Sequence, residues 1–349
     1  MKCTIQNIAD HLGLSRNTVS KALKNSSEVS ENTRNLVIKT ASKLGYKNAT
    51  FATPVIPASE TSSNGTILFL TRTYASDSEF WTTVLRGIES ILSNANYHLA
   101  ISIMSDSDLK QLNFPQTISD SSIKGIILVE ICDKVVCDAL SQFNLPIVSV
   151  DMPNVPFEEL NGIDVVTMES KKNLKKIINQ LIEKGAESFG FVGDLYSPNV
   201  SRGFQERYNA LSECLAEHQL PLNQKNCLLH QTPEDFRNFQ TTVNNLQAMI
   251  SLPDVFICGN DWTAIQLIYA LQFLGFQIPK DICVVGFDNI PAASRISPSL
   301  TTISTPQKYL GIAAARQILE RIQHPNCPHV FCQYETELII RNSTNIISF

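Results

Sequence analysis

Apolar positions near the start of the chain repeat every three or four residues, which predicts short amphipathic helices. The first such segment, Ile5–Leu12, is followed by Gly13, which suits the left-handed backbone at a helix end. Ser15 and Ser30 each precede a further helical segment and suit the N-cap position. We therefore expect three helices in this head. The inner face of the third would consist of Leu36, Val37, Thr40, Ala41 and Leu44.

The pattern changes twice after the head. Residues 48–64 are rich in Pro, Ser, Thr and Ala, with a single charged residue, and predict a hinge or linker. From Gly65 onward, short buried-strand runs alternate with amphipathic helical segments. The predicted strands are Thr66–Thr71, His98–Met104, Gly125–Glu130, Ile147–Asp151, Ser188–Gly193, Val255–Cys258 and Cys283–Phe287. The clearest helical segments are Phe80–Asn94, Lys171–Lys184, Phe204–His218 and Trp262–Leu274.

Alternating strands and helices predict parallel sheets covered by helices on both faces. Residues 65–349 are too many for one comfortable sheet, so we expect two lobes, with the break near Pro153–Gly162. Lobe 1 would hold about 65–160 and 291–325, and lobe 2 about 161–290 and 326–341. Ligands of such sheets lie beyond the carboxyl ends of the strands, which here face a cleft between the lobes.

Charge is distributed unevenly along the chain. Residues 1–50 carry eight Lys/Arg and three acidic residues, which gives +5. Because the whole chain carries −5, residues 51–349 carry −10. A small basic head on an acidic body indicates a module that binds a polyanion, joined to a domain of another kind.

Several classes of protein find no support in the sequence. No apolar run is long enough to span a bilayer and no secretory signal is visible, so we expect a cytoplasmic protein without a membrane partner. The nine cysteines are scattered without a CxxC pair, and the six histidines form no cluster, so we predict no metal and no cofactor. Neither a phosphate-binding glycine loop nor a catalytic constellation is present, which argues against an enzyme.

The head has the spacing of a helix-turn-helix motif. Ala9, Gly13 and Val19 supply the small contact residue, the turn glycine and the aliphatic residue that seals the helix pair. The second helix would then present its N-terminal end to the major groove of DNA. The side chains predicted to face the DNA there are Ser15, Arg16, Asn17, Ser20 and Lys21.

The chemistry of these side chains suits DNA. Arg16 can pair with guanine and Asn17 with adenine, while Lys21 can reach a base or a phosphate. Thr4, Ser30 and Thr33 lie near helix starts, where hydroxyls and backbone N–H groups can bind phosphates. The alternative is a plain three-helix bundle.

The string TIQNIADHLGLSRNTVSKALKNSSEVSENTRNLVIKTASKLGY closely resembles the head of the lactose-repressor (LacI/GalR) family, with Asn7 in place of the family's aspartate. The resemblance implies an all-α, lambda-repressor-like head on a two-lobed, periplasmic-binding-protein-like α/β body. It also implies a hinge helix that places a leucine in the minor groove. Here Val55 occupies the leucine's position, directly after Pro54, which would break a helix interior. Either the hinge helix is short and weak, or another residue such as Phe51 is the wedge.

The resemblance extends through the body. FQERYNALSECL is similar to an element whose arginine, here Arg207, bonds the effector in the family, although Ala210 replaces its glycine and Leu211 its aromatic residue. A later stretch, CGNDWTAIQ to VVGFDNIP, supplies Asn260, Asp261 and Asp288 at strand ends, which we expect in the effector site. The alternatives are that Asp261 caps the following helix and that Asp288 starts a turn.

Three further residues are candidates for the effector site. Phe80 and Trp81 open the first body helix, where family members place side chains that stack on the effector; the alternative is lobe core. Asp151 ends a predicted strand of the first lobe and would line the cleft.

These features predict a sequence-specific DNA-binding transcription regulator, in the family's usual sense a repressor, controlled by a small effector between the lobes. The partners would be a near-palindromic double-stranded operator, a second copy of the chain in a homodimer, and a saccharide. A nucleobase or a phosphorylated sugar is the alternative effector. The alternative function is a cytosolic solute-binding protein without direct gene control. The residues after Glu337 do not form the heptad helix of the family's tetramers, which leaves a dimer.

Overall fold

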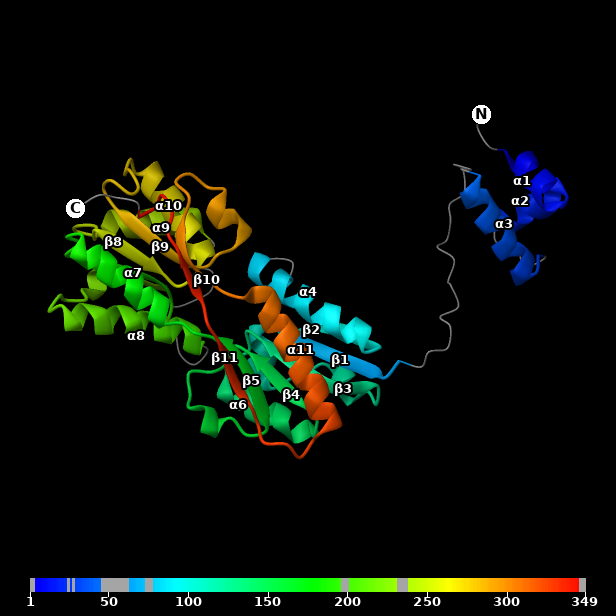
Figure 1. The fold of residues 1–349 in the computed structure, drawn as a ribbon, viewed down its shortest axis with the longest axis horizontal. Helices are drawn as coiled ribbons and strands as arrows, with labels where there is room; N and C mark the ends of the chain where they lie inside the picture. The colour runs from blue at the N-terminus through cyan, green and yellow to red at the C-terminus, as the bar shows by residue number, and fades with distance from the viewer. Residues whose placement is uncertain are drawn as a thin grey trace. The chain divides into compact units, whose positions relative to one another are not determined.

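The computed structural model describes residues 4–23, 26, 29–44, 63–72, 78–195, 201–230 and 238–344. The chain divides into two compact units, residues 1–62 and 63–349. The first is the predicted head, and the second is the α/β body (Figure 1). Residues 45–62, which contain Val55 and most of the predicted linker, lie outside the described residues.

The head consists of three helices, α1 (Ile5–Leu12), α2 (Arg16–Leu23) and α3 (Glu31–Lys43), as the sequence predicts. Gly13 follows α1 with a φ of 64°, and its N–H bonds back to the Ala9 carbonyl, so the tight turn uses glycine's freedom at positive φ. Ala9 and Val19 are buried in one shared core, which confirms the predicted contact between α1 and α2. The prediction for Leu36 was wrong, since half of its surface is exposed on α3.

The body contains two six-stranded sheets. The sheet of lobe 1 has the order β11-β5-β4-β3-β1-β2, and all its strand pairs are parallel. Its strands are β1 (Gly65–Thr71), β2 (Tyr97–Ile103), β3 (Ile123–Val129), β4 (Ile147–Val150), β5 (Ile163–Met168) and β11 (Phe331–Tyr334).

The sheet of lobe 2 has the order β12-β10-β9-β8-β6-β7 and is parallel except for the β10–β12 pair. Its strands are β6 (Phe189–Asp194), β7 (Leu228–His230), β8 (Val255–Cys258), β9 (Cys283–Asp288), β10 (Thr301–Ser304) and β12 (Glu337–Ile339). The predicted class, an all-α head on a two-lobed body with mainly parallel sheets, is confirmed.

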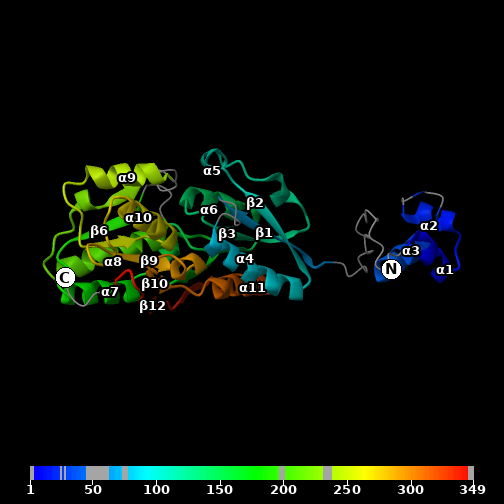
Figure 2. The same cartoon turned by 90° about the horizontal axis from the view of Figure 1, so that it is seen from above.

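Helices cover both faces of each sheet (Figure 2). In lobe 1, α6 lies on one face and α4 and α11 on the other; in lobe 2, α9 and α7 lie on opposite faces. This double cover explains why β5 and β8 are buried along their whole length and β3 at every residue except Lys124. The body helices are α4 (Glu79–Asn94), α5 (Asp106–Gln111), α6 (Lys134–Leu140), α7 (Lys172–Glu183), α8 (Arg202–Glu217), α9 (Phe239–Ala248), α10 (Asp261–Phe273) and α11 (Gln307–Gln323).

The lobe boundaries differ from the predicted ones. β5 belongs to lobe 1, so the chain first crosses after Met168 and not near Pro153–Gly162. β10 belongs to lobe 2, although it lies within the segment 291–325 expected in lobe 1, and β11 belongs to lobe 1, although 326–341 was expected in lobe 2. The reason is that the chain crosses three times, and each crossing directly follows a strand that the apolar pattern did not reveal.

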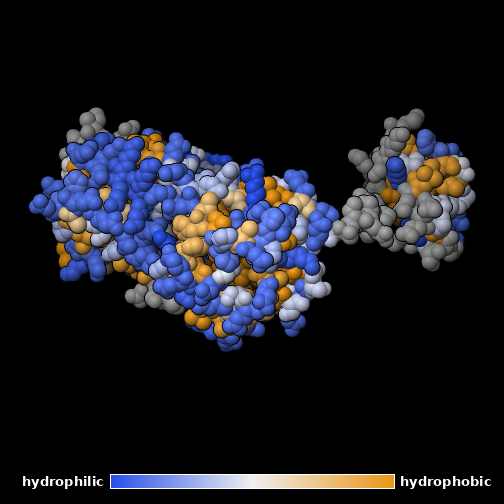
Figure 3. All heavy atoms as spheres, turned by 60° about the horizontal axis from the view of Figure 1, so that its bottom comes forward, coloured by the Kyte–Doolittle hydropathy of each residue, from blue (hydrophilic) through white to orange (hydrophobic). Residues whose placement is uncertain are grey.

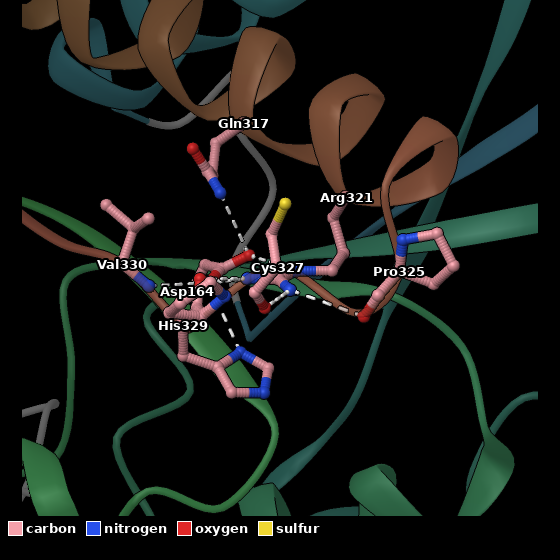
Figure 4. Close-up of polar contacts among 8 residues, drawn as sticks. Asp164, Gln317, Arg321, Pro325, Cys327, His329 and Val330 are labelled. Carbon is pink, nitrogen blue, oxygen red and sulfur yellow. Dashed lines mark hydrogen bonds and ion pairs between the residues drawn. The ribbon is translucent and has the colours of Figure 1, made fainter.

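A buried ion pair fixes two of these crossing segments on lobe 1 (Figure 4). Asp164 of β5 is fully buried and accepts hydrogen bonds from Arg321 of α11 at 2.8 and 3.0 Å and from the Val330 N–H at 2.8 Å. Arg321 also donates to the backbone carbonyls of Pro325, Cys327 and Pro328. The carboxylate therefore joins β5, the end of α11 and the segment that enters β11.

Among the described residues, no helix is long and apolar enough to cross a membrane.

Candidate functional site: a DNA-facing helix and an effector cleft

The exposed side of the head carries the predicted DNA-reading residues. Arg16 and Asn17 lie in the first turn of α2 and are exposed, while Ser20 and Lys21 on the same helix are half-buried. Val19 and Ala22 point into the core, because they lie on the opposite face of this 3.6-residue repeat. The arrangement leaves the start of α2 free to meet another molecule.

Two helix starts meet at one hollow of about 280 Å³ beside that face. Ser15 and Ser30 each accept a bond from the backbone N–H three residues on, in Thr18 and Thr33 respectively. Partial positive charge at these helix starts, together with Lys21, favours an anion in the hollow. Its lining is Ser15, Asn17, Thr18, Lys21, Val29, Ser30 and Thr33.

Thr4 caps α1 through a reciprocal pair of bonds with Asn7 and does not line the hollow. Asn7, which departs from the family's aspartate, therefore keeps the capping role with an amide oxygen. Arg34 donates to the Ser26 and Val29 carbonyls and so fixes the turn between α2 and α3.

In the body, Arg207 is the centre of the predicted effector site. Its side chain on α8 is 4% exposed and donates to the Gly259 carbonyl at 2.6 Å. The guanidinium lies 3.6 Å from the centre of the Phe287 ring and 5.3 Å from that of Phe204. Its Nε has no hydrogen-bond partner among the residues that the structure describes. A buried, incompletely bonded guanidinium is costly, and such groups are typical of sites where a ligand completes the hydrogen bonding.

Two carboxylates from different lobes lie near Arg207. Asp151 follows β4 and Asp288 ends β9, both at positive φ, 76° and 113°. Backbone strain of this kind at a non-glycine residue is typical of ligand sites. Burial raises the pKa of Asp151 to about 6 against the opposing hydrogen bond from the Met152 N–H, and it raises the pKa of Asp288 well above its ordinary value against the charge of Arg207.

The lobes contact each other around this site. The Arg202 N–H at the start of α8 donates to the Met152 carbonyl of lobe 1 at 3.0 Å, and Pro153 forms a β-bridge with Ser201. The Ser201 side chain lies close enough to the Asp151 carboxylate to lower its pKa. Elsewhere, the Glu79 carboxylate of α4 accepts from the Ala292 N–H of lobe 2 at 3.3 Å. Helix α8 thus carries both a lobe–lobe contact and Arg207.

The structure contradicts the prediction that Asp261 contacts an effector. Asp261 is fully buried, and its oxygens accept bonds from the Thr302 hydroxyl and the Ile290 N–H, which join α10 to β10 and to the segment after β9. Burial raises its pKa to about 7. Asn260, and not Asp261, caps α10 through a bond from the Thr263 N–H, and its side chain is half-buried.

Phe80 and Trp81 lie in the body core with 7% and 8% of their surfaces exposed, and their rings form an edge-to-face pair. Phe80 is therefore a residue of the lobe core, which was the alternative to a contact with the effector. The Trp81 indole N–H donates to the carboxylate of Glu130, which follows β3 at a φ of 59°. Trp81 thus positions an acidic side chain at a third strand end.

Sequence reasoning missed several residues of this site: Glu130, Ser170, Ser201, Phe204, Gly259 and Phe287. Glu130 was findable, because it ends a predicted strand as Asp151 does. Ser170 could not have been found, since nothing in the local sequence marks its buried hydroxyl, which lies with Arg207 beside Gly203 and has no hydrogen-bond partner in the described parts of the chain. No group of three or more potential metal ligands occurs in the part of the chain that the structure describes.

Comparison with known proteins divides the chain into the same two parts, head and body. Residues 4–48 match the family described as bacterial regulatory proteins, lacI family. Residues 178–344 match a periplasmic binding protein-like domain.

Whole-chain relatives and structures agree with these matches. The ribose operon repressor of Haemophilus influenzae is 27% identical over 344 residues, 97% of this chain and 98% of the relative. The structure of a transcriptional regulator CelR–cellobiose complex superposes with a TM-score of 0.69 at 19% identity and covers 98% of this chain and 100% of that one. The lac repressor dimer bound to operator and the anti-inducer ONPF gives a TM-score of 0.66 at 18% identity, with 99% of each chain covered.

Proposed function

Since this protein belongs to the lacI family of bacterial regulatory proteins, we propose that it is a repressor whose affinity for operator DNA is controlled by a sugar bound between its two lobes. The observation that carries the proposal is Arg207, which is buried, incompletely bonded and close to carboxylates of both lobes. The protein would act in the cytoplasm, where its operator lies.

The head reads the operator through α2. Arg16 and Asn17, exposed at the start of the helix, supply the base contacts, because a guanidinium fork fits guanine and an amide fits adenine. Lys21 and the capped starts of α2 and α3 bind the phosphates. A homodimer presents two heads to two half-sites of a near-palindrome.

The effector binds where α8 meets the strand ends. Asp151, Asp288 and Arg207 bond the sugar hydroxyls, and Phe287 and Trp81 supply apolar walls. Asn260 contributes its free amide. Because Asp151 and Arg207 belong to different lobes, a ligand that bonds both changes the free energy of lobe closure. The same motion shifts Ser201 and Arg202 against Met152 and changes the spacing of the two heads.

Selection of bound duplexes from random DNA, followed by fluorescence anisotropy, tests the DNA half of the proposal. Arg16→Ala with Asn17→Ala should weaken binding at least tenfold, from about 1–3 kcal/mol per lost base contact. Lys39→Ala, an exposed charge on α3, is the matched control and should leave the selected sequence unchanged. Full-strength binding by the Arg16/Asn17 variant would contradict the assignment.

A thermal-shift screen of neutral sugars tests the effector half, because a ligand at 100 times its Kd raises stability by about 2.7 kcal/mol. The sugar that binds should lower operator affinity. Arg207→Ala should abolish the thermal shift and the response to sugar but keep operator binding. Equal sugar response in this variant would place the effector elsewhere.

A further inference from the structure

The backbone carbonyl of Asp288 accepts hydrogen bonds from the segment that crosses from lobe 2 back to lobe 1. The side-chain amide of Gln307 donates to this oxygen at 2.6 Å, and the hydroxyl and N–H of Thr305 donate at 3.2 and 3.4 Å. Because a carbonyl oxygen has two lone pairs and short bonds are the stronger ones, the Gln307 amide is the main donor. Gln307 is only 8% exposed, so the bond is shielded from water.

The bond between Gln307 and Asp288 joins the two lobes. Asp288 ends β9 in the sheet of lobe 2, whereas Gln307 is the first residue of α11, which covers the sheet of lobe 1. The length of this bond therefore depends on where the start of α11 lies relative to the end of β9.

The backbone on both sides of the bonded carbonyl is strained. Asp288 has a φ of 113° and Asn289 a φ of 56°, so two successive non-glycine residues lie in the region that favours glycine. Such conformations persist only where surrounding contacts fix them. Asn289 is fixed within lobe 2, because its side chain accepts from Arg341 at 2.6 Å and donates to Ser304 at 3.1 Å. The bond from Gln307 is the corresponding contact for Asp288, and it comes from lobe 1.

Helix α4 holds the same segment a second time from lobe 1. Four residues after Asp288, the Ala292 N–H donates to the carboxylate of Glu79 on α4 at 3.3 Å. α4 and α11 lie side by side (Figure 1), and the lack of side chains at Gly87 and Gly311 brings their backbones into contact. Because closely packed helices move as one body, this pair holds residues 288–292 near both ends.

We infer that Gln307 is a positioning residue, which fixes the backbone of Asp288 from lobe 1 and thereby the direction of the Asp288 carboxylate. This inference rests on the proposed function, in which Asp288 contacts the effector. The direction of a side chain depends on the backbone at its own Cα, so a lobe movement that breaks the Gln307 bond also turns the carboxylate. Since coupling is reciprocal, a ligand that binds the carboxylate in its present direction favours the position of α11 in which Gln307 is bonded.

Hydrogen exchange of backbone amides, followed by mass spectrometry, tests the inference on the full-length protein without sugar or DNA. Gln307→Leu removes the donor at nearly constant side-chain size, and Gln307→Met is a second donor-free variant in case leucine does not fit the site. Gln323→Leu, the same substitution at an exposed position near the end of α11, is the matched control. Exchange is compared in residues 286–296, in the first turns of α11, and in β3, which serves as the check that each variant is folded.

Loss of one buried hydrogen bond should speed exchange in residues 286–296 about three- to tenfold in both Gln307 variants and leave the control unchanged. The N–H groups of Ile290 and Ala292 should respond, because their bonds to Asp261 and Glu79 depend on the same segment. A residue that merely stabilises the start of α11 would speed exchange there and leave residues 286–296 unchanged. That result would overturn the inference, as would unchanged exchange in both regions.

These outcomes are separable from those of the proposed function, because neither sugar nor operator enters the exchange experiment. If no sugar binds or no operator is recognised, the regulator proposal falls, and the exchange result still decides whether Gln307 fixes Asp288. If exchange is unchanged while a sugar releases the operator, only the role of Gln307 falls.

Discussion

Asp151 gives the most direct residue-scale prediction, because its folded pKa of about 6 lies above its ordinary value. A raised carboxyl pKa means that the folded state disfavours the charged form, so the cost is absent below about pH 3.8, grows up to about pH 6 and is constant above it. Asp151→Asn should therefore raise the melting temperature of the ligand-free protein at pH 7.5, by about 2–4 °C for roughly 1–2 kcal/mol. At pH 4.5 the gain should shrink to about a third of that value, because most of the cost develops between pH 4.5 and 6.

The measurement is a pair of thermal melts across pH 4–8, with Glu335→Gln as the matched acid-to-amide control. Glu335 lies on the surface in a pair with Lys172, both largely exposed, and should change stability by less than about 0.5 kcal/mol at every pH. A gain for Asp151→Asn that is equal at pH 4.5 and 7.5 would contradict the linkage.

Asp164 should behave in the opposite way. Burial alone would raise the pKa of Asp164, but hydrogen bonds from Arg321 and Val330 hold this pKa below its ordinary value. Asp164→Asn leaves the guanidinium of Arg321, only 5% exposed, without its counter-charge, so we expect a loss of about 3–5 kcal/mol in the free energy of unfolding. Urea unfolding at pH 7 measures this loss, and a change below 1 kcal/mol would show that the pair does not fix the crossing segments.

At the residue scale, the sequence could identify which side chains have the chemistry of a ligand site, but not which groups those side chains bond. Arg207, Asp151 and Asp288 were recognisable as polar groups at strand ends or in a family motif, and the structure brings them together. Asp261 has the same local signature, yet its oxygens are used by Thr302 and Ile290, which are distant in sequence. Only tertiary contacts distinguish a carboxylate that is free for a ligand from one that holds strands together.

The pair of helices α4 and α11 shows how two glycines set a contact between elements. A Cβ at Gly311 would lie 2.0 Å from the Val84 carbonyl oxygen, and one at Gly87 would lie 2.2 Å from the Lys308 carbonyl oxygen. Gly311→Ala should therefore push the helices apart and cost about 1–3 kcal/mol despite alanine's better helix propensity. Glu320→Ala, exposed on the same helix, is the control. Equal urea midpoints for the two variants would refute the close packing.

The strands that the sequence pattern predicted are rich in apolar residues. All seven predicted strands exist, and six of them have apolar residues that are buried on both faces, whereas the edge strand β2 is only partly buried. Four missed strands, β7, β10, β11 and β12, have only three or four residues, and the fifth, β5, reads IDVVTM, with the buried polar residues Asp164 and Thr167 among its apolar ones. β10 reads TTIS, and its buried Thr301 and Thr302 are satisfied by Ser343, Arg341 and Asp261. Such hydroxyl networks carry no periodic signal in the sequence. The missed strands β5, β10 and β11 precede the crossings, which is why the lobe boundaries were misplaced.

At the scale of the whole molecule, apolar side chains gather on the face of lobe 1 seen in Figure 3, whereas the same face of lobe 2 is largely hydrophilic. Lobe 1 also exposes half or more of Ile101 on its edge strand β2 and of Val135 on α6. Exposed apolar surface of this kind favours association, which agrees with the proposed homodimer.

The separation into two units has a consequence that can be measured. In the described parts of the chain, the head core consists of residues of α1 to α3 and of the segments next to them, and none of these residues belongs to the body cores. Stability should therefore be local to each unit.

Removing residues 1–62 should leave the melting temperature of the body within about 2 °C and its sugar affinity within about twofold, since neither the lobe cores nor Arg207 is touched. Operator binding should disappear, because the groups that meet phosphate and bases are all in the head. Calorimetry and anisotropy on the shortened and full-length chains measure both effects. In the full-length chain, Lys21→Ala should lower the salt dependence of operator binding by about one phosphate contact. A body that melts more than about 5 °C lower, or that still binds the operator, would mean that head and body share stability or DNA contacts, and the two-unit mechanism would then have to be abandoned.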